Sequence, residues 1–218
     1  AAAAPTAPAT AAAAPAATAP PADTEAEAPL FASPTTRDRI GRIVAPVTIN
    51  GRGPFRLVVD TGASRSTISP ELAAALGLTP SAEEPMLLNG ITGSARVPTV
   101  SLDRMQAGSL VIESTRVPVV WSSIMAGADG ILGVAGLRRE RIQVDFRRDR
   151  VVIATSVGRP NLVGYLRIPA KRVAGGLLVV DAKVGRVRVK AVLDTGAERT
   201  LGNRALREAL YGPVDPNA

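Results

Sequence analysis

Two aspartates in identical four-residue blocks are the side chains of this sequence best suited to chemistry. Asp60-Thr61-Gly62-Ala63 and Asp194-Thr195-Gly196-Ala197 each follow a short apolar run, at 57–59 and 191–193. One Asp-Thr-Gly is weak evidence, because an Asp followed by turn-forming residues closes many strands. Two copies in matching surroundings indicate that two carboxylates are presented symmetrically. Such a pair can share one proton and activate a water molecule.

The composition excludes several other kinds of site, because the 218 residues include no His and no Cys. Nucleophiles activated by His, zinc sites of the usual His and Cys kinds, and disulfides cannot form. Acid–base chemistry must fall to carboxylates, Lys or Tyr. We therefore expect no cofactor and no metal. The net charge of +7 is spread over scattered Arg residues with few aromatic residues between them, so we predict a solvated basic surface and no nucleic-acid partner.

The sequence also repeats itself at an offset of 134 positions, since 194 minus 60 is 134. In this register Gly41 falls on Gly175, and further matches extend on both sides of the two blocks, which indicates internal duplication. Only the first copy continues, because the counterpart of Gly130 would lie near position 264 and the sequence given has 218 residues. Two explanations stay open. The chain is a piece of a longer protein, which we favour, or the second unit is degenerate.

Turn signals and periodicity predict the elements that must position the aspartates. Strands at 43–49 and 55–59 are expected to form a hairpin around Asn50-Gly51. After a short extended stretch, Ser69-Pro70 favours the start of a helix that ends at Gly77, and Gly202-Asn203 predicts a second helix over 205–210. The remaining expected elements are strands at 96–102, 109–112 and 116–120, a short helix around 137–141, and a hairpin of 142–146 and 151–154.

Two further segments complete the pattern. Residues 89–94, Asn-Gly-Ile-Thr-Gly-Ser, form a tip bounded by glycines between extended stretches, which suggests a mobile hairpin. Gly130-Ile131-Leu132-Gly133 is a block of small, apolar, apolar and small residues.

With both Asp-Thr-Gly-Ala blocks, this hairpin tip and Gly130–Gly133, the chain resembles the retropepsin-like aspartic proteases, in the bacterial single-chain form with two tandem lobes. The resemblance implies an all-β fold of closed, barrel-like lobes with short helices. The lobe would be duplicated, with the second lobe incomplete in this chain. The domains expected are an Ala/Pro-rich disordered linker over 1–35, a first lobe with its flap over 36–158, and the front part of a second lobe over 159–218.

The same resemblance implies roles for individual residues. Asp60 and Asp194 would be the catalytic pair at the bottom of a cleft. The loop residues that support them would be Thr61, Gly62, Ala63, Thr195, Gly196 and Ala197. Substrate would contact Ser64 and the flap residues Asn89, Gly90, Ile91, Thr92 and Gly93. Structural support behind the catalytic loop would come from Gly130, Ile131, Leu132 and Gly133.

We therefore predict an aspartic endopeptidase that binds a peptide or protein substrate in extended form, and we expect it to be a processing protease of the cell envelope. Two alternatives stay open: a non-catalytic peptide-binding or assembly module that keeps the fold, and a homodimeric protease that pairs Asp60 from two chains. The residue after each Gly is Ala, as in retroviral proteases, so no hydroxyl donates to the carboxylates there. We therefore expect a mildly acidic to near-neutral activity optimum.

The start of the chain predicts where the protein acts. Residues 1–22 are Ala, Pro and Thr alone, and the sequence begins with Ala rather than Met. Such a tether next to a processed end, with the signal peptide removed, is expected of a periplasmic or secreted protein, including one anchored to a membrane through the removed N-terminus. The alternative is the disordered tail of a cytoplasmic protein.

Overall fold

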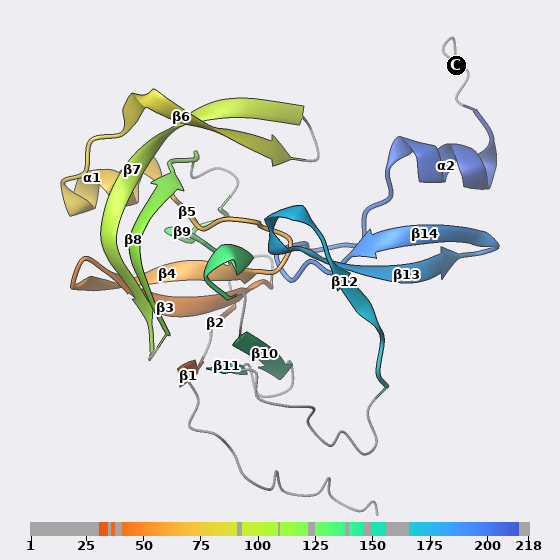
Figure 1. Ribbon diagram of the computed structural model, residues 1–218, viewed down its shortest axis with the longest axis horizontal. Helices are drawn as coiled ribbons and strands as arrows, with labels where there is room; N and C mark the ends of the chain where they lie inside the picture. Colours follow the sequence, from red (N-terminus) through yellow and green to blue (C-terminus); the bar gives the residue numbers. More distant parts are fainter. Residues whose placement is uncertain are drawn as a thin grey trace, which may run out of the picture.

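The protein, seen in a computed structural model, is all-β with short helices, as predicted (Figure 1). The structure describes residues 31–34, 36–37, 41–90, 93–108, 110–121, 125–137, 140–145, 150–155 and 166–213. The elements of the first lobe are β1 (Phe31–Pro34), β2 (Thr36–Arg37), β3 (Ile43–Ile49), β4 (Arg52–Asp60), β5 (Thr67–Ile68), α1 (Pro70–Leu76), β6 (Ser81–Gly90), β7 (Gly93–Ala107), β8 (Leu110–Pro118), β9 (Gly130–Gly133), the 3₁₀ turn η2 (Val134–Leu137), β10 (Glu140–Asp145) and β11 (Arg150–Thr155).

Strands β3 and β4 form the predicted hairpin, and β4 ends at Asp60. Asn50 and Gly51 at its turn have φ of 50° and 73°. These left-handed values are those of a tight hairpin turn, and Asn-Gly adopts them at low cost. The turn residues therefore fix the register that brings β4 to the loop of residues 60–63.

One curled sheet carries the site. Its strand order is β5-β9-β4-β3-β7-β6, with β2 beside β3 and β8 beside β7. The long strands β6, β7 and β8 curve over β3 and β4 (Figure 1). Strand β9 runs parallel to β4, which sets Asp60 level with Gly133, and β5 closes the edge of the sheet beside β9. The core between these strands is aliphatic, with side chains such as Ile49, Leu57 and Leu132 fully buried.

Helix α1 forms as the sequence predicts. The Ser69 hydroxyl accepts the N–H of Leu72 at 3.0 Å, and Gly77 ends the helix with φ of 74°. Both are the usual caps of a short helix. The helix buries Leu72 and Ala73 against the core.

Three boundaries differ from the prediction. The strands predicted at 109–112 and 116–120 are one strand, β8, because the long partner β7 pairs with it across the polar residues between them. The helix predicted around 137–141 is instead η2, since the residues from Glu140 on pair with β11. The linker predicted over 1–35 extends too far, because Phe31–Pro34 form β1 by antiparallel pairing with β11.

The second lobe repeats the front of the first. Its elements are β12 (Ala170–Arg172), the 3₁₀ turn η3 (Ala174–Gly176), β13 (Leu178–Val184), β14 (Val187–Val192) and α2 (Arg204–Tyr211). The hairpin β13–β14 turns at Gly185, and the Asn203 side chain caps α2 by accepting the N–H of Leu206 at 2.9 Å. None of the helices in the described part of the chain is long and apolar enough to cross a membrane.

The two lobes differ in what covers them. Val58 and Val59 are 0% and 1% exposed, whereas their counterparts Val192 and Leu193 are 47% and 45% exposed. Strand β4 has β9 along one side, while β14 is an edge strand among the described residues. The repeated sequence therefore has a complete core only in the first lobe, as far as the described residues go.

Candidate active site

The two Asp-Thr-Gly-Ala loops are joined by crossed hydrogen bonds between their threonines. The N–H of Thr61 donates to Oγ1 of Thr195 at 3.1 Å, and the N–H of Thr195 donates to Oγ1 of Thr61 at 3.1 Å. Each threonine hydroxyl also donates to a backbone carbonyl of the opposite segment. The Thr61 hydroxyl donates to the carbonyl of Leu193, and the Thr195 hydroxyl donates to the carbonyl of Val59, both at 2.8 Å. The four bonds hold the two loops in one symmetric arrangement.

Each loop also holds its own carboxylate in the same way. Oδ1 of Asp60 accepts the N–H groups of Gly62 at 2.7 Å and Ala63 at 3.1 Å. Oδ1 of Asp194 accepts the corresponding N–H groups of Gly196 and Ala197, at 2.8 Å and 3.0 Å. The second oxygen of each carboxyl group is thus left to face other partners.

The glycines of the two loops allow the carboxyl groups to approach each other. A Cβ added to Gly62 would lie 2.3 Å from Cγ of Asp194, and one added to Gly196 would lie 2.4 Å from Cγ of Asp60. Carbon atoms in contact are normally about 3.5–4.0 Å apart. Only glycine fits at either position, so each aspartate packs directly on the backbone of the opposite loop.

The surroundings of Asp60 raise the pKa of its carboxyl group from 3.8 to about 6. Burial of the carboxyl group is the largest cause, the negative charge of Asp194 is the next, and a hydrogen bond with Asp194 adds to both. The N–H groups of Gly62 and Ala63 act in the opposite direction because they stabilise the ionised form. Asp60 therefore retains a proton in mildly acidic solution.

Strand β9 lies behind the catalytic loop. A Cβ on Gly133 would lie 2.4 Å from the carbonyl carbon of Arg65, and the N–H of Val134 donates to the carbonyl of Ala63 at 2.9 Å. The N–H of Gly133 donates to the Ser66 hydroxyl at 3.1 Å. Sequence reasoning missed Ser66, because a hydroxyl in a loop carries no signal of its partner. Gly130 of the same strand also has no room for a side chain, because a Cβ added to it would lie 2.4 Å from the carbonyl oxygen of Thr67.

The predicted substrate-binding residues are only partly placed. In the flap hairpin of β6 and β7, Asn89 pairs with Ser94 and Gly90 with Gly93, and the Ser94 hydroxyl donates to Oδ1 of Asn89 at 2.6 Å. The predicted tip residues, Ile91 and Thr92, lie outside the described residues. Ser64 lies next to Gly175 of the second lobe. Contact of these residues with substrate remains a prediction.

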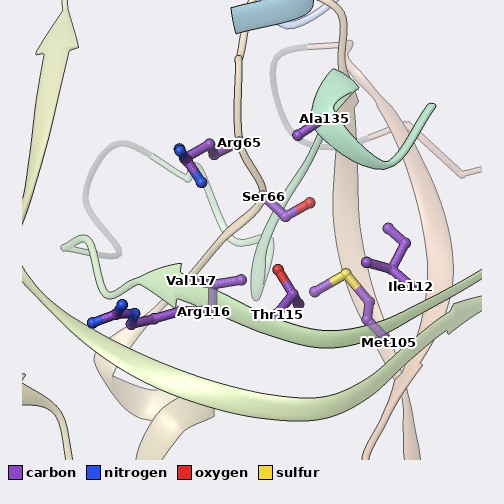
Figure 2. Close-up of a pocket in the computed structure, with 8 residues that line it drawn as sticks. All are labelled: Arg65, Ser66, Met105, Ile112, Thr115, Arg116, Val117 and Ala135. Atoms are coloured by element: carbon purple, nitrogen blue, oxygen red, sulfur yellow. The ribbon is translucent and has the colours of Figure 1, made fainter. Parts of the chain in front are cut away.

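A cavity of about 110 Å³ lies beside the end of the catalytic loop (Figure 2). Its lining comes from that loop, from β7 and β8, and from η2: Arg65, Ser66, Met105, Ile112, Thr115, Arg116, Val117 and Ala135. The two aspartates are not in the lining, so the cavity is separate from the carboxylate pair. No group of three or more acidic side chains that could hold a metal ion occurs in the described part of the chain.

Comparison with known proteins agrees with this geometry. Residues 45–135, which contain Asp60 and the Gly130–Gly133 block, match the family model described as aspartyl protease. Over this segment the predicted resemblance to aspartic proteases is confirmed, because the segment is similar to the aspartyl protease family. Among solved structures, a retropepsin-like aspartic protease from Rickettsia conorii is similar, with a TM-score of 0.42 and 19% identity, over 56% of this chain and 90% of that one. The comparison with curated proteins gave no match.

Proposed function

We propose that this protein is an aspartic endopeptidase that hydrolyses peptide bonds with a water molecule activated by Asp60 and Asp194. The observation that carries the proposal is the joining of the two loops, which sets one carboxyl group against the other within a single chain. The family match supports an aspartic protease, and the pairing of these two residues is the finer step that we add.

The chemistry follows from one shared proton. Two carboxylates this close do not both ionise, and the pKa of about 6 makes Asp60 the member that keeps the proton. Asp194, as the carboxylate, takes a proton from the water while the water oxygen bonds to the carbonyl carbon of the substrate. Asp60 donates its proton to the carbonyl oxygen, which gives a neutral tetrahedral intermediate. Collapse of the intermediate returns a proton to Asp60 and passes one from Asp194 to the leaving amine.

The flap hairpin indicates how a substrate would bind. Strands β6 and β7 end at the glycine-bounded tip, and an extended peptide can add to such strands through main-chain hydrogen bonds. We infer that the peptide lies between this hairpin and the catalytic loops, with apolar side chains beside the cleaved bond. We also propose that the enzyme is a processing protease of the cell envelope, periplasmic or secreted, and tethered by its Ala/Pro-rich start.

Substitution of each aspartate tests the proposal. Asp60→Asn and Asp194→Asn should each lower cleavage of a casein-like substrate by about 10³-fold, the range expected for loss of general acid–base catalysis. Asp181→Asn is the matched control, because Asp181 is an exposed carboxylate whose charge partners are Lys190 and Lys171. A statine-type inhibitor should block the wild-type activity. Full activity of either aspartate variant would contradict the proposal.

The same variants separate the alternatives. A homodimer that pairs Asp60 from two chains would keep its activity in Asp194→Asn, whereas an intrachain pair would lose it. A peptide-binding module would bind the casein-like substrate without cleaving it in any variant. The four hydrogen bonds between Thr61, Thr195 and their partners favour the intrachain pair.

A further inference from the structure

A tight turn at the start of the second lobe, residues 173–177, carries two glycines in left-handed backbone conformations. We name it the docking turn. Gly175 and Gly176 have φ of 78° and 88°, where residues with a side chain are strained. The turn is closed by two hydrogen bonds, from the N–H of Val173 to the carbonyl of Leu177 at 2.9 Å and from the N–H of Gly176 to the carbonyl of Val173 at 3.0 Å. The turn is therefore compact.

The docking turn lies directly on the catalytic loop of the first lobe. A Cβ on Gly175 would lie 2.4 Å from Oγ and 3.0 Å from Cβ of Ser64, which follows Ala63 in that loop. A Cβ on Gly176 would lie 3.3 Å from Cγ2 of Val134, whose N–H holds the carbonyl of Ala63. The backbone of the turn is thus in contact with the loop that carries Asp60.

The other end of the turn leads to the second aspartate. Strand β13 begins at Leu178, and the carbonyl of Leu178 accepts the N–H of Leu193 at 3.0 Å. Leu193 precedes Asp194, and its own carbonyl accepts the hydroxyl of Thr61 at 2.8 Å. A shift of the docking turn can therefore reach Asp194 through the hydrogen bond between Leu178 and Leu193.

The internal repeat supplies a counterpart that lacks this contact. Gly41 occupies the position equivalent to Gly175 and has a similar φ, 88°. A Cβ on Gly41 would meet nothing within 4 Å among the residues that the structure describes. Both glycines satisfy the same backbone requirement, but only Gly175 lies against another lobe.

We propose that Gly175 is a positioning residue for the hydrolysis proposed above, because its lack of a side chain lets the docking turn lie on Ser64 and so sets Asp194 against Asp60. This inference rests on the proposed function. The Ser64 hydroxyl, 2.4 Å from the Cβ position of Gly175, can rotate away, but Cβ of Ser64 lies 3.0 Å from that position and cannot. A methyl group at 175 therefore requires a shift of about 0.5 Å to reach an ordinary contact distance. Since a misplacement of about 1 Å can cost about 100-fold in rate, we expect about tenfold here.

The test compares Gly175→Ala with Gly41→Ala, which introduces the same backbone strain without the clash. Thermal melting should show a similar modest loss of stability in both variants. Gly175→Ala should lower kcat by about tenfold with KM changed by less than about threefold. Gly41→Ala should stay within about threefold of wild type in both constants. Equal kcat for the two variants would overturn the proposal.

Removal of the Ser64 side chain gives a second test of the same contact. In a Ser64→Gly background, Gly175→Ala should cost less than about threefold in kcat, because the clashing atoms are gone. Ser64→Gly alone is the reference, since Ser64 is also a candidate substrate contact. An undiminished loss in the double variant would overturn the proposal. Should Gly175→Ala alone fail to fold, recovery of folding and activity by Ser64→Gly supports the proposal, and no recovery overturns it.

Titration of Asp60 separates this inference from the proposed function. If wild type cleaves nothing, the proposed function fails, but the positioning can still be measured by NMR of the Asp60 carboxyl carbon. Its pKa of about 6 should fall toward 3.8 in folded Gly175→Ala, because burial and Asp194 both raise it. It should stay unchanged in Gly41→Ala. Identical pKa values in wild type and both variants would refute the positioning role whatever the activity.

Discussion

The crossed threonine bonds lead to the most direct prediction, that Thr195→Val loosens the joint between the lobes. Valine has nearly the shape of threonine, so the substitution removes hydrogen bonds without leaving a cavity. Oγ1 of Thr195 donates to the carbonyl of Val59 at 2.8 Å and accepts the N–H of Thr61 at 3.1 Å. The variant loses both bonds and leaves two backbone groups of the first lobe without these partners.

The expected cost follows from these two bonds. Each contributes about 0.5–1.5 kcal/mol net, so Thr195→Val should lower the free energy of unfolding by about 1–3 kcal/mol. Thr195 is only half-buried, so water can reach the backbone groups that lose their partners. This favours the lower half of the range. By symmetry, Thr61→Val should cost the same within about 0.5 kcal/mol, since Thr61 makes the equivalent bonds to Leu193 and Thr195.

Urea denaturation and steady-state kinetics would measure the effect, with Thr195→Ser as the control that keeps the hydroxyl. We expect kcat of Thr195→Val to fall about tenfold or more, since about 1.4 kcal/mol of lost alignment corresponds to a factor of ten. Thr195→Ser should stay near wild type in both measurements. If Thr195→Val matches Thr195→Ser in unfolding free energy and in kcat, the crossed bonds do not hold the pair together and the reasoning is refuted.

Three further predictions follow from the same site. Because the pKa of Asp60 is raised to about 6, the folded protein binds more protons than the unfolded chain above about pH 3.8. The contribution of Asp60 to the free energy of unfolding is therefore fully present below pH 3.8 and is lost as the pH rises through 6. The loss should be about 2–3 kcal/mol. Urea midpoints of Asp60→Asn, measured over the same pH range, should not show it. Gly62→Ala should abolish cleavage, because its Cβ would lie 2.3 Å from Cγ of Asp194, and an active variant would show that the loops separate easily. Val58→Ala should lower the free energy of unfolding by about 2 kcal/mol and Val192→Ala by less than about 1 kcal/mol, because Val58 is buried and Val192 is 47% exposed. Equal losses in chemical denaturation would mean that Val192 is covered in solution.

Local signals predicted the parts of the fold that local rules determine. Asn50-Gly51 set a hairpin turn, and Ser69 with Gly77 set the ends of α1, because each acts on its immediate neighbours. The division of β8 into two strands was wrong, since its continuity depends on pairing with β7. Strand β1 was missed for a similar reason, because its partner β11 lies more than a hundred residues further along the chain.

The site shows the same division between local and distant causes. Duplication of the Asp-Thr-Gly-Ala block was enough to predict that Asp60 pairs with Asp194. It gave no sign of the Ser66 hydroxyl under Gly133, nor of the contact between Ser64 and Gly175. Such contacts depend on how two lobes and a parallel strand come together, and no periodicity or turn signal encodes that.

Identical sequence does not give the two aspartates identical surroundings. Asp60 is half-buried at the end of β4, where the parallel strand β9 lies alongside, whereas Asp194 is exposed at the end of an edge strand of the described residues. Burial is the largest cause of the raised pKa of Asp60. In the mechanism proposed above, the half-buried Asp60 is therefore the member of the pair that keeps the shared proton.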